Sequence, residues 1–187
     1  DRGTRVHNEI ESYLRGVGEF PQEARHFADE IESLKKHFKA GRVSLEGEWA
    51  FDKDWKATEW LWGWLRLKLD ANVHLTDKHA VVIDYKTGRK FGNEIKHGEQ
   101  MQLYALAVLL KFPHIEHVTC ELWYLDVNDL ASLTVVRPIG MRFFKPFDRR
   151  GRKMTEATDF PPNPNTYSCQ WCPYHPIKGS GDCPHGV

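Results

Sequence analysis

The sequence has no excess of charge of either sign and no long apolar run. Lys and Arg together number 26, Asp and Glu together also number 26, and the formal net charge of the 187 residues is zero with histidine neutral. This balance excludes a protein coated with positive charge for nucleic acid, so a polyanion must be bound by local charge or through metal ions. No apolar run approaches the roughly 20 residues of a membrane-spanning helix, and no signal-peptide pattern is present. We therefore expect a cytoplasmic protein, bacterial or from a phage in its host, without a membrane partner.

Cysteine is also scarce, and its distribution divides the chain. Hydrophobic residues make up 41% and aromatic residues 12% of the sequence, which is enough for a core and excludes a disordered chain. Three of the four cysteines follow the Pro-rich segment 161–165. This clustering is typical of a metal site in a reducing compartment rather than of a disulfide framework. We expect one domain over residues 1–160 and a metal-binding tail, residues 161–187, packed on it.

The spacing of apolar residues predicts a mixture of helices and strands. Helices are expected over residues 3–16, 22–40 and 99–112, and strands over 42–51, 64–75, 80–86, 118–126 and 132–137. A last helix is expected only at the ends of residues 141–157, because Pro146 and Gly151 disturb its middle. This order predicts an α/β fold in which helices surround a mixed sheet.

Two acids and a lysine lie on the two strands of a predicted hairpin. Apolar residues at every second position of 65–75 predict a strand with one apolar and one polar face, and Asp70 is on the polar face. On the return strand Asp84 and Lys86 are two residues apart and share a face. A turn with an odd number of residues places Asp70 opposite Asp84 or Lys86, whereas an even turn places it on the other side. The connection 76–79 allows either register.

Two adjacent carboxylates repel each other, which is unfavourable unless a cation lies between them. Mg²⁺ prefers oxygen ligands of this kind and keeps waters for chemistry. A lysine on the same face would neutralise developing negative charge or orient an attacking water. The alternative is an ordinary ion pair on an exposed sheet surface. A run of apolar residues, 81–83, leads directly to Asp84 and favours the catalytic interpretation.

Four segments, in order, resemble the PD-(D/E)XK nuclease superfamily, and in particular its RecB-like exonuclease branch. They are residues 2–11, 69–71, 82–88 and 100–104. The resemblance implies a restriction-endonuclease-like fold, which is a central mixed β-sheet flanked by helices. It also implies that His7, Asp70, Asp84 and the backbone carbonyl of Tyr85 hold a catalytic Mg²⁺ or Mn²⁺ ion, and that Lys86 positions or activates the hydrolytic water.

The resemblance further implies that Gln100 and Tyr104, one helical turn apart, contact DNA or brace the site. Tyr104 has an alternative role as a core aromatic, and His7 an alternative role as a polar residue on an amphipathic helix. Glu46 or Glu48, at the edge of the first strand, is either a second acid near the site or solvated charge.

Basic residues gather in two places and are candidates for DNA contact. The first set, beside the proposed site, is Arg89, Lys90 and Lys96, and the second set, interleaved with phenylalanines, is Arg149, Arg150, Arg152 and Lys153. Such a mixture can follow a phosphate backbone while stacking unpaired bases. The alternative for the second set is a solvated helix face. Five tryptophans crowd residues 49–64, and Trp60 or Trp62 is a candidate for a base-stacking or strand-separating wedge.

The cysteines of the tail predict a structural metal site. Cys169 and Cys172 form a Cys-x-x-Cys turn, Cys183 is the third ligand, and His175 is favoured over His185 as the fourth. RecB-like relatives often carry a four-cysteine iron–sulfur cluster here, with one cysteine ahead of the first helix. No cysteine precedes His7, and the remaining one, at position 120, is expected in the core, so Zn²⁺ is predicted rather than an iron–sulfur cluster.

These observations predict a metal-dependent DNA nuclease, and most specifically an exonuclease of recombination, repair or phage DNA processing. Its partner would be DNA with a free end or a single-stranded portion, together with a helicase or recombination protein. The alternative is a non-cleaving, nuclease-like DNA-binding module of a larger helicase or adaptation complex. A restriction-type endonuclease is a third reading, although no sequence-reading element is evident.

Overall fold

The computed structural model describes residues 1–88 and 90–187. Two compact units make up the chain, Asp1–Phe147 and Asp148–Val187. The division falls inside helix α5, Phe144–Glu156, whereas the sequence places the domain boundary at the Pro-rich segment after residue 160. Among the described residues, no helix is long and apolar enough to cross a membrane.

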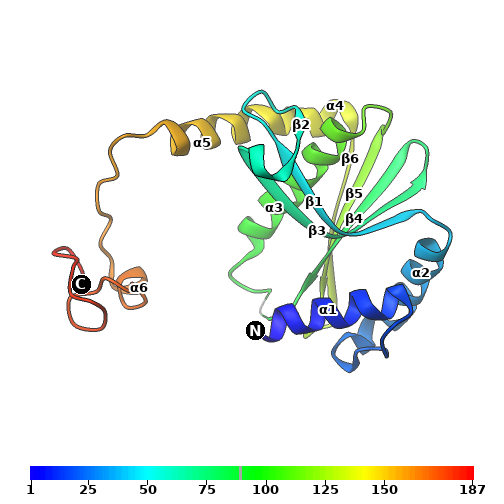
Figure 1. The fold of residues 1–187 in the computed structure, drawn as a ribbon, viewed down its shortest axis with the longest axis horizontal. Helices are drawn as coiled ribbons and strands as arrows, with labels where there is room; N and C mark the ends of the chain where they lie inside the picture. The colour runs from blue at the N-terminus through cyan, green and yellow to red at the C-terminus, as the bar shows by residue number, and fades with distance from the viewer. Residues whose placement is uncertain (89) are drawn as a thin grey trace. The chain divides into compact units, whose positions relative to one another are not determined.

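A six-stranded mixed sheet forms the centre of the first unit, in the order β2-β1-β3-β4-β5-β6 (Figure 1). Its strands are β1 Val43–Phe51, β2 Ala57–Thr58, β3 Leu65–Thr76, β4 His79–Lys86, β5 His117–Tyr124 and β6 Asp129–Val136. Neighbours are antiparallel except β4 and β5, which run parallel and therefore need a crossover helix between them. The sheet and its helices confirm the predicted α/β class. The two-residue strand β2 was not predicted.

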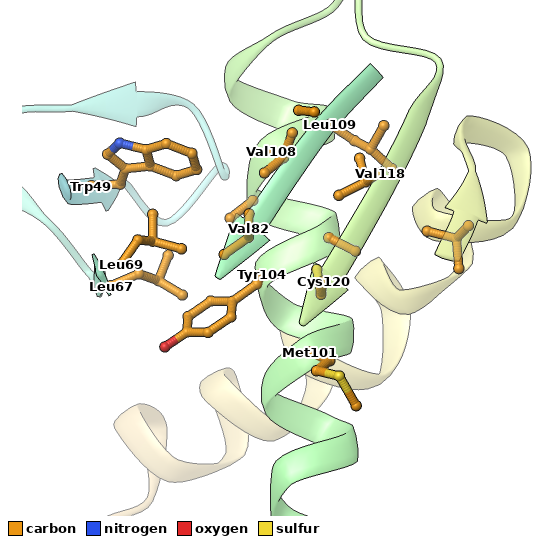
Figure 2. Close-up of a cluster of buried hydrophobic side chains, with 14 of the residues drawn as sticks. Trp49, Leu67, Leu69, Val82, Met101, Tyr104, Val108, Leu109, Val118 and Cys120 are labelled. Carbon is orange, nitrogen blue, oxygen red and sulfur yellow. The ribbon is translucent and has the colours of Figure 1, made fainter. Parts of the chain in front are cut away.

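Helices cover both faces of this sheet. The first face carries α1 Arg2–Arg15, the 3-10 helix η1 Gln22–Phe27 and α2 Ala28–Lys39, whose apolar side chains pack with the strands in one core cluster. The second face carries α3 Glu94–Lys111, which connects β4 to β5 and forms the other core cluster. Figure 2 shows part of the second cluster, in which Tyr104 and Val108 of α3 lie among strand residues such as Leu69 and Val82.

Strand β3 changes the face to which its apolar residues point, and this corrects the prediction of one apolar face. Leu67 and Leu69 belong to the α3-side core, whereas Ala71 and Val73 belong to the α1-side core. The change occurs at Asp70. On the neighbouring strand β1, Glu46 has a φ of 48° and lies between two regular pairs, Leu45 with Ala71 and Gly47 with Leu69. This irregularity in both strands is what lets the alternating sequence serve both cores.

A bulge in the β3–β4 hairpin decides the register that the sequence left open. Asp77 and Lys78 form the turn, and Thr76 pairs with His79. Without an irregularity, an even turn of this kind would place Asp70 opposite Tyr85. The register shifts between His74 and Thr76, so that Ala71 pairs with Ile83 and the next position, Asp70, is level with Asp84. The two acids therefore meet despite the even turn.

The segment after β6 is more helical than predicted. A short helix α4, Arg137–Gly140, and a 3-10 turn η3, Met141–Phe143, lead into the continuous α5. Pro146 lies in the first turn of α5, where a missing N–H breaks no intrahelical bond, and Gly151 does not interrupt it. In the second unit a four-residue helix α6, Thr166–Cys169, precedes the remaining cysteines.

Candidate active site

Asp70 lies where β3 and β4 separate, just beyond the last regular pair between them. Its Oδ2 accepts a hydrogen bond of 2.6 Å from the backbone N–H of Tyr85. The carboxylate thus accepts, in place of a backbone carbonyl, from an N–H group of β4, and this contact ties Asp70 to the residue between Asp84 and Lys86. The carbonyl of Tyr85, proposed as a ligand, belongs to the same short stretch.

Helix α1 brings His7 to this carboxylate. The helix is fixed by the buried side chains of Val6 and Ile10 on the sheet. The His7 ring then lies edge-on to Tyr85, and its Nδ1 is 3.1 Å from Asp70 Oδ1. The hydrogen bond to Asp70 raises the pKa of His7 above its ordinary value, although burial opposes it. The structure therefore brings together the histidine and the first acid that the sequence analysis paired.

The start of α1 is held by a contact that the sequence did not suggest. The guanidinium of Arg2 donates to both carboxylate oxygens of Asp126, at 2.8 and 2.7 Å. Asp126 also accepts from the backbone N–H of Gly88 at 2.8 Å. This bidentate pair links α1, and thereby His7, to the chain that follows β4.

Asp84 is nearly buried, and its side chain contacts residues of α3. Its Oδ2 is 2.6 Å from Nζ of Lys86, which confirms that the two residues share a face. Its Oδ1 accepts from the hydroxyl of Tyr104 at 2.9 Å and from Nε2 of Gln100 at 3.2 Å. Burial raises the pKa of Asp84, Lys86 opposes this rise, and the negative charge of Asp70 adds to it. A divalent cation would compensate for the charge that both carboxylates hold here.

Tyr104 fills both roles that the sequence left open. Its ring is 5% exposed and belongs to the α3-side core, while its hydroxyl lies at the edge of that core (Figure 2). The hydroxyl is within hydrogen-bond distance of Asp84 and of the carbonyl of Lys68, and it accepts from Gln100 at 2.6 Å. Burial, followed by the charge of Asp84, raises the pKa of Tyr104 far above its ordinary range, so the phenol stays neutral.

A histidine of α3 and a tyrosine of β5 form a further contact near these residues. His97 is three residues before Gln100 on α3, and its Nδ1 is 2.6 Å from the hydroxyl of Tyr124. Burial lowers the pKa of His97, and the charge of Lys86 lowers it further. The spacing of His97, Gln100 and Tyr104 on one helix face is the signal that could have identified it.

Of the two glutamates on β1, Glu46 is electrostatically linked to the acids. Burial raises the pKa of Glu46, and the charge of Asp70 contributes to that shift. Glu48 instead forms an exposed ion pair with Lys68 at 2.8 Å. Glu46 is therefore the better candidate for an additional acid near the site.

The donors fit a hard divalent ion. Asp70 and Asp84 supply carboxylate oxygens, Tyr85 a carbonyl and His7 an imidazole, a set that suits Mg²⁺ or Mn²⁺. The Asp70 and Asp84 side chains are only 13% and 9% exposed, so negative charge is concentrated away from water. Within the part of the chain that the structure describes, no three His, Cys, Asp or Glu side chains form a ready-made metal site. The carboxylates instead contact His7 and Lys86, contacts that an ion would replace.

The basic residues near this site differ in their availability. Arg89 lies outside the described residues. Lys90 forms an ion pair with Asp129 and lies over the ring of Tyr124, at 5.5 Å from its centroid. Lys96 is exposed on the first turn of α3.

The second basic set lies on α5. Arg149, Arg150 and Lys153 are exposed. Arg152 is half-buried, and its guanidinium bonds to Asp148 at 2.9 Å and lies 3.8 Å from Glu156.

The cysteines of the second unit surround a compact turn. The N–H of Cys172 donates to the carbonyl of Cys169 at 3.0 Å, and the N–H of Cys183 donates to the carbonyl of Tyr174 at 3.0 Å. All three thiols are free and partly exposed. Cys120, in contrast, is buried in the α3-side core, as expected.

His175, the favoured fourth ligand, does not fit that role as it is placed. Its Nδ1 accepts from the N–H groups of Ile177 at 3.0 Å and Lys178 at 3.1 Å. A neutral ring that accepts at Nδ1 carries its proton on Nε2, and neither nitrogen then offers a lone pair to a metal. His175 is 6% exposed, so its role here is to hold the turn, and the exposed His185 remains the other histidine of the tail.

Comparisons with known proteins identify the family of the chain. No curated protein matches the chain. Sixteen chains of solved structures match it. One of these structures, titled "Crystal structure of SSO0001", is 16% identical, with 97% of this chain and 95% of that chain covered, at a TM-score of 0.37. The description of the PD-(D/E)XK nuclease superfamily matches residues 1–177. The chain therefore belongs to the PD-(D/E)XK nuclease superfamily.

Proposed function

We propose that this protein is a metal-dependent DNA nuclease, and specifically a RecB-like exonuclease that hydrolyses phosphodiester bonds in recombination, repair or phage DNA processing. The observation that carries the proposal is the convergence of Asp84, Lys86, Asp70 and His7 at the point where β3 and β4 separate. Membership in a nuclease superfamily supports it. The branch and the exonuclease mode rest on the sequence motifs alone.

In this proposal Asp70, Asp84, the Tyr85 carbonyl and His7 hold the ion. When bound, such an ion would supply positive charge for the phosphate and would make water a better nucleophile. Lys86, whose ammonium is 2.6 Å from Asp84 Oδ2, holds the attacking water or stabilises the charge that develops on the phosphate oxygens. Gln100 and Tyr104 both donate to Asp84 Oδ1 and so leave Oδ2 directed to the reacting atoms. These two donors keep the Asp84 carboxylate oriented when the contact between its Oδ2 and Lys86 changes.

DNA contact is proposed for the exposed cations. Lys96 follows the site on α3, and Arg149, Arg150 and Lys153 lie on α5. Lys90 would need to leave Asp129 to reach a phosphate. Ion pairs near the surface contribute little to stability, so such an exchange is feasible.

We also propose that the tail binds Zn²⁺ through Cys169, Cys172 and Cys183. Thiolates in a Cys-x-x-Cys turn suit tetrahedral zinc. His185 would be the fourth ligand, because Nδ1 of His175 accepts from two backbone N–H groups. Zinc would stabilise a unit with few buried apolar side chains.

Digestion of end-labelled linear DNA and of closed circular DNA with Mg²⁺ or Mn²⁺ tests the nuclease. Loss of linear DNA alone, abolished by Asp84→Ala, is the expected result. Nicking of circles would replace the exonuclease by an endonuclease. The absence of metal-dependent cleavage would instead favour the non-cleaving DNA-binding module of a larger helicase or adaptation complex.

A further inference from the structure

The five tryptophans between residues 49 and 64 do not share one environment. Trp49 and Trp55 are buried, at 6% and 5% exposure, and Trp64 packs against Trp55 with ring centroids 5.9 Å apart. Trp62 is 74% exposed, and Trp60 is half-buried beside it in the 3-10 turn η2, Trp60–Trp62. Trp49 belongs to the α3-side core, and Trp55 and Trp64 pack against each other in the loop. Trp62 lies next to Leu61, which is 77% exposed, and adjacent exposed apolar side chains on one turn are typical of an interaction surface.

The turn that carries Trp62 is firmly attached to the sheet. A Cβ on Gly63 would lie 2.7 Å from Ala50 Cβ. Only glycine therefore lets the backbone of the turn pack this closely against β1. Nη2 of Arg66 donates to the carbonyl of Leu61 at 3.1 Å. The N–H of Trp64 donates to the carbonyl of Phe51 at 2.9 Å. Trp62 is thus presented by a fixed backbone rather than by a loosely held loop.

Trp60 connects this turn to the acids of the candidate site. Its ring centroid is 5.5 Å from the Arg66 guanidinium and 5.6 Å from Nζ of Lys68. Leu67 and Leu69 face α3, so Lys68 between them is on the other face, the one from which His7 approaches Asp70. Two residues along a strand span roughly 7 Å, which is about the step between neighbouring nucleotides of an extended strand. Arg66 and Lys68, which lie over the Trp60 ring of η2, therefore lead along β3 toward Asp70.

We propose that Trp60 and Trp62, with Arg66 and Lys68, form a stacking platform that guides single-stranded DNA into the acidic site. The inference rests on the proposed function, because it assigns the substrate path of the same site. The rings of Trp60 and Trp62 can stack on unpaired bases of any sequence, while Arg66 and Lys68 meet the phosphates. Bases of an intact duplex are stacked on one another, so the platform selects a single-stranded end over a duplex.

Fluorescence anisotropy of a labelled single-stranded oligonucleotide tests this proposal. We would measure the dissociation constant without added divalent ions, so that no cleavage occurs, for the wild type, Trp62→Leu and Phe160→Leu. The control, Phe160, is an exposed aromatic at 72% outside the first unit. Loss of one stacked base weakens binding by about tenfold. We expect this increase for Trp62→Leu, no change for Phe160→Leu, and no effect of Trp62→Leu on duplex binding.

The binding measurements test the stacking platform independently of nuclease activity. An unchanged dissociation constant for Trp62→Leu contradicts the platform, even if the wild type cleaves DNA. Equal weakening of single-stranded and duplex binding also contradicts it. Loss of self-association in Trp62→Leu with normal DNA affinity would assign the turn to a protein contact instead. A tenfold loss of single-strand affinity supports the platform whether or not metal-dependent cleavage is found, and the digestion assay then judges the nuclease alone.

Discussion

At the scale of single residues, Asp84 is the carboxylate on which the proposed chemistry depends most. Its side chain is nearly buried near the end of β4. Lys86, Tyr104 and Gln100 all contact it. Burial raises its pKa, so the ionised form that a metal needs is held at a cost in folding free energy. A buried carboxylate with this many partners is typical of a site in which stability is given up for activity.

Asp84→Asn should stabilise the metal-free protein near pH 7.5. The folded-state pKa of Asp84 is raised, so its contribution to stability is fully present below the unfolded-state pKa of about 4 and is lost as the pH rises through the folded-state pKa. Asparagine keeps an acceptor for Tyr104 without the charge. We expect a gain of roughly 1 kcal/mol in the free energy of unfolding at pH 7.5, and a smaller gain near pH 4, from urea titrations with EDTA. A loss of stability at pH 7.5 would mean that the Lys86 ion pair outweighs the burial of charge.

Tyr104→Phe should change the pH dependence of cleavage rather than the fold. The hydroxyl favours the ionised form of Asp84, so its removal raises the pKa of that carboxyl and moves the acidic limb of the rate profile to higher pH. At neutral pH we expect about a tenfold lower rate. Tyr124→Phe is the control, because that hydroxyl bonds to His97 instead. An unshifted acidic limb in Tyr104→Phe would leave Tyr104 as a core residue only.

At the scale of elements, the sequence predicted which residues would meet but not how. The spacing of Asp84 and Lys86 fixes a shared face on any strand, and helical spacing fixes Gln100 and Tyr104. The meeting of Asp70 with Asp84 depends on a bulge between His74 and Thr76, for which the local sequence carries no glycine or other marker. The change of face at Asp70 is equally hidden, because strict alternation of apolar residues looks identical in a strand that serves one core or two.

Two glycines in the α3 region should respond in opposite directions to alanine. A Cβ at Gly140 would meet Leu109 Cδ1 at 2.4 Å and Val135 Cγ2 at 3.2 Å, whereas a Cβ at Gly98, within α3, meets nothing within 4 Å. We expect Gly140→Ala to destabilise the protein by about 1 to 3 kcal/mol through overpacking. We expect Gly98→Ala to stabilise it by about 0.5 to 1 kcal/mol through helix propensity. Thermal unfolding followed by circular dichroism measures both, and equal effects would contradict the packing of α4 on α3.

At the scale of the whole molecule, the chain comprises a sheet-based unit and a small cysteine-rich unit. The fold class and the candidate site of the first unit were predictable because periodicity and four ordered motifs agree. The division at Phe147/Asp148 was not, because α5 continues through Pro146 and Gly151. The fourth ligand of the tail was not predictable either, since the spacing of Cys172 and His175 and that of Cys183 and His185 do not show which ring nitrogen the backbone engages.

Metal analysis of the purified protein tests the tail. We expect about one zinc ion per chain, lost in Cys172→Ser and in His185→Ala. His175→Ala should keep the metal. It should weaken the turn only, because the N–H groups of Ile177 and Lys178 lose the Nδ1 acceptor of His175. Iron in place of zinc would contradict the assignment of the metal. Loss of zinc in His175→Ala but not in His185→Ala would restore His175 as the ligand.

The central claim is that Asp70 and Asp84, beside His7 and Lys86, bind one divalent ion. Titration of the protein with Mn²⁺, followed by electron paramagnetic resonance of the free ion, measures this directly. The wild type should bind Mn²⁺ at this site, Asp70→Asn and Asp84→Asn should each lose that binding, and Glu48→Gln, which removes an exposed ion-pair partner, should not. Equal Mn²⁺ binding by the wild type and both aspartate variants would contradict the account.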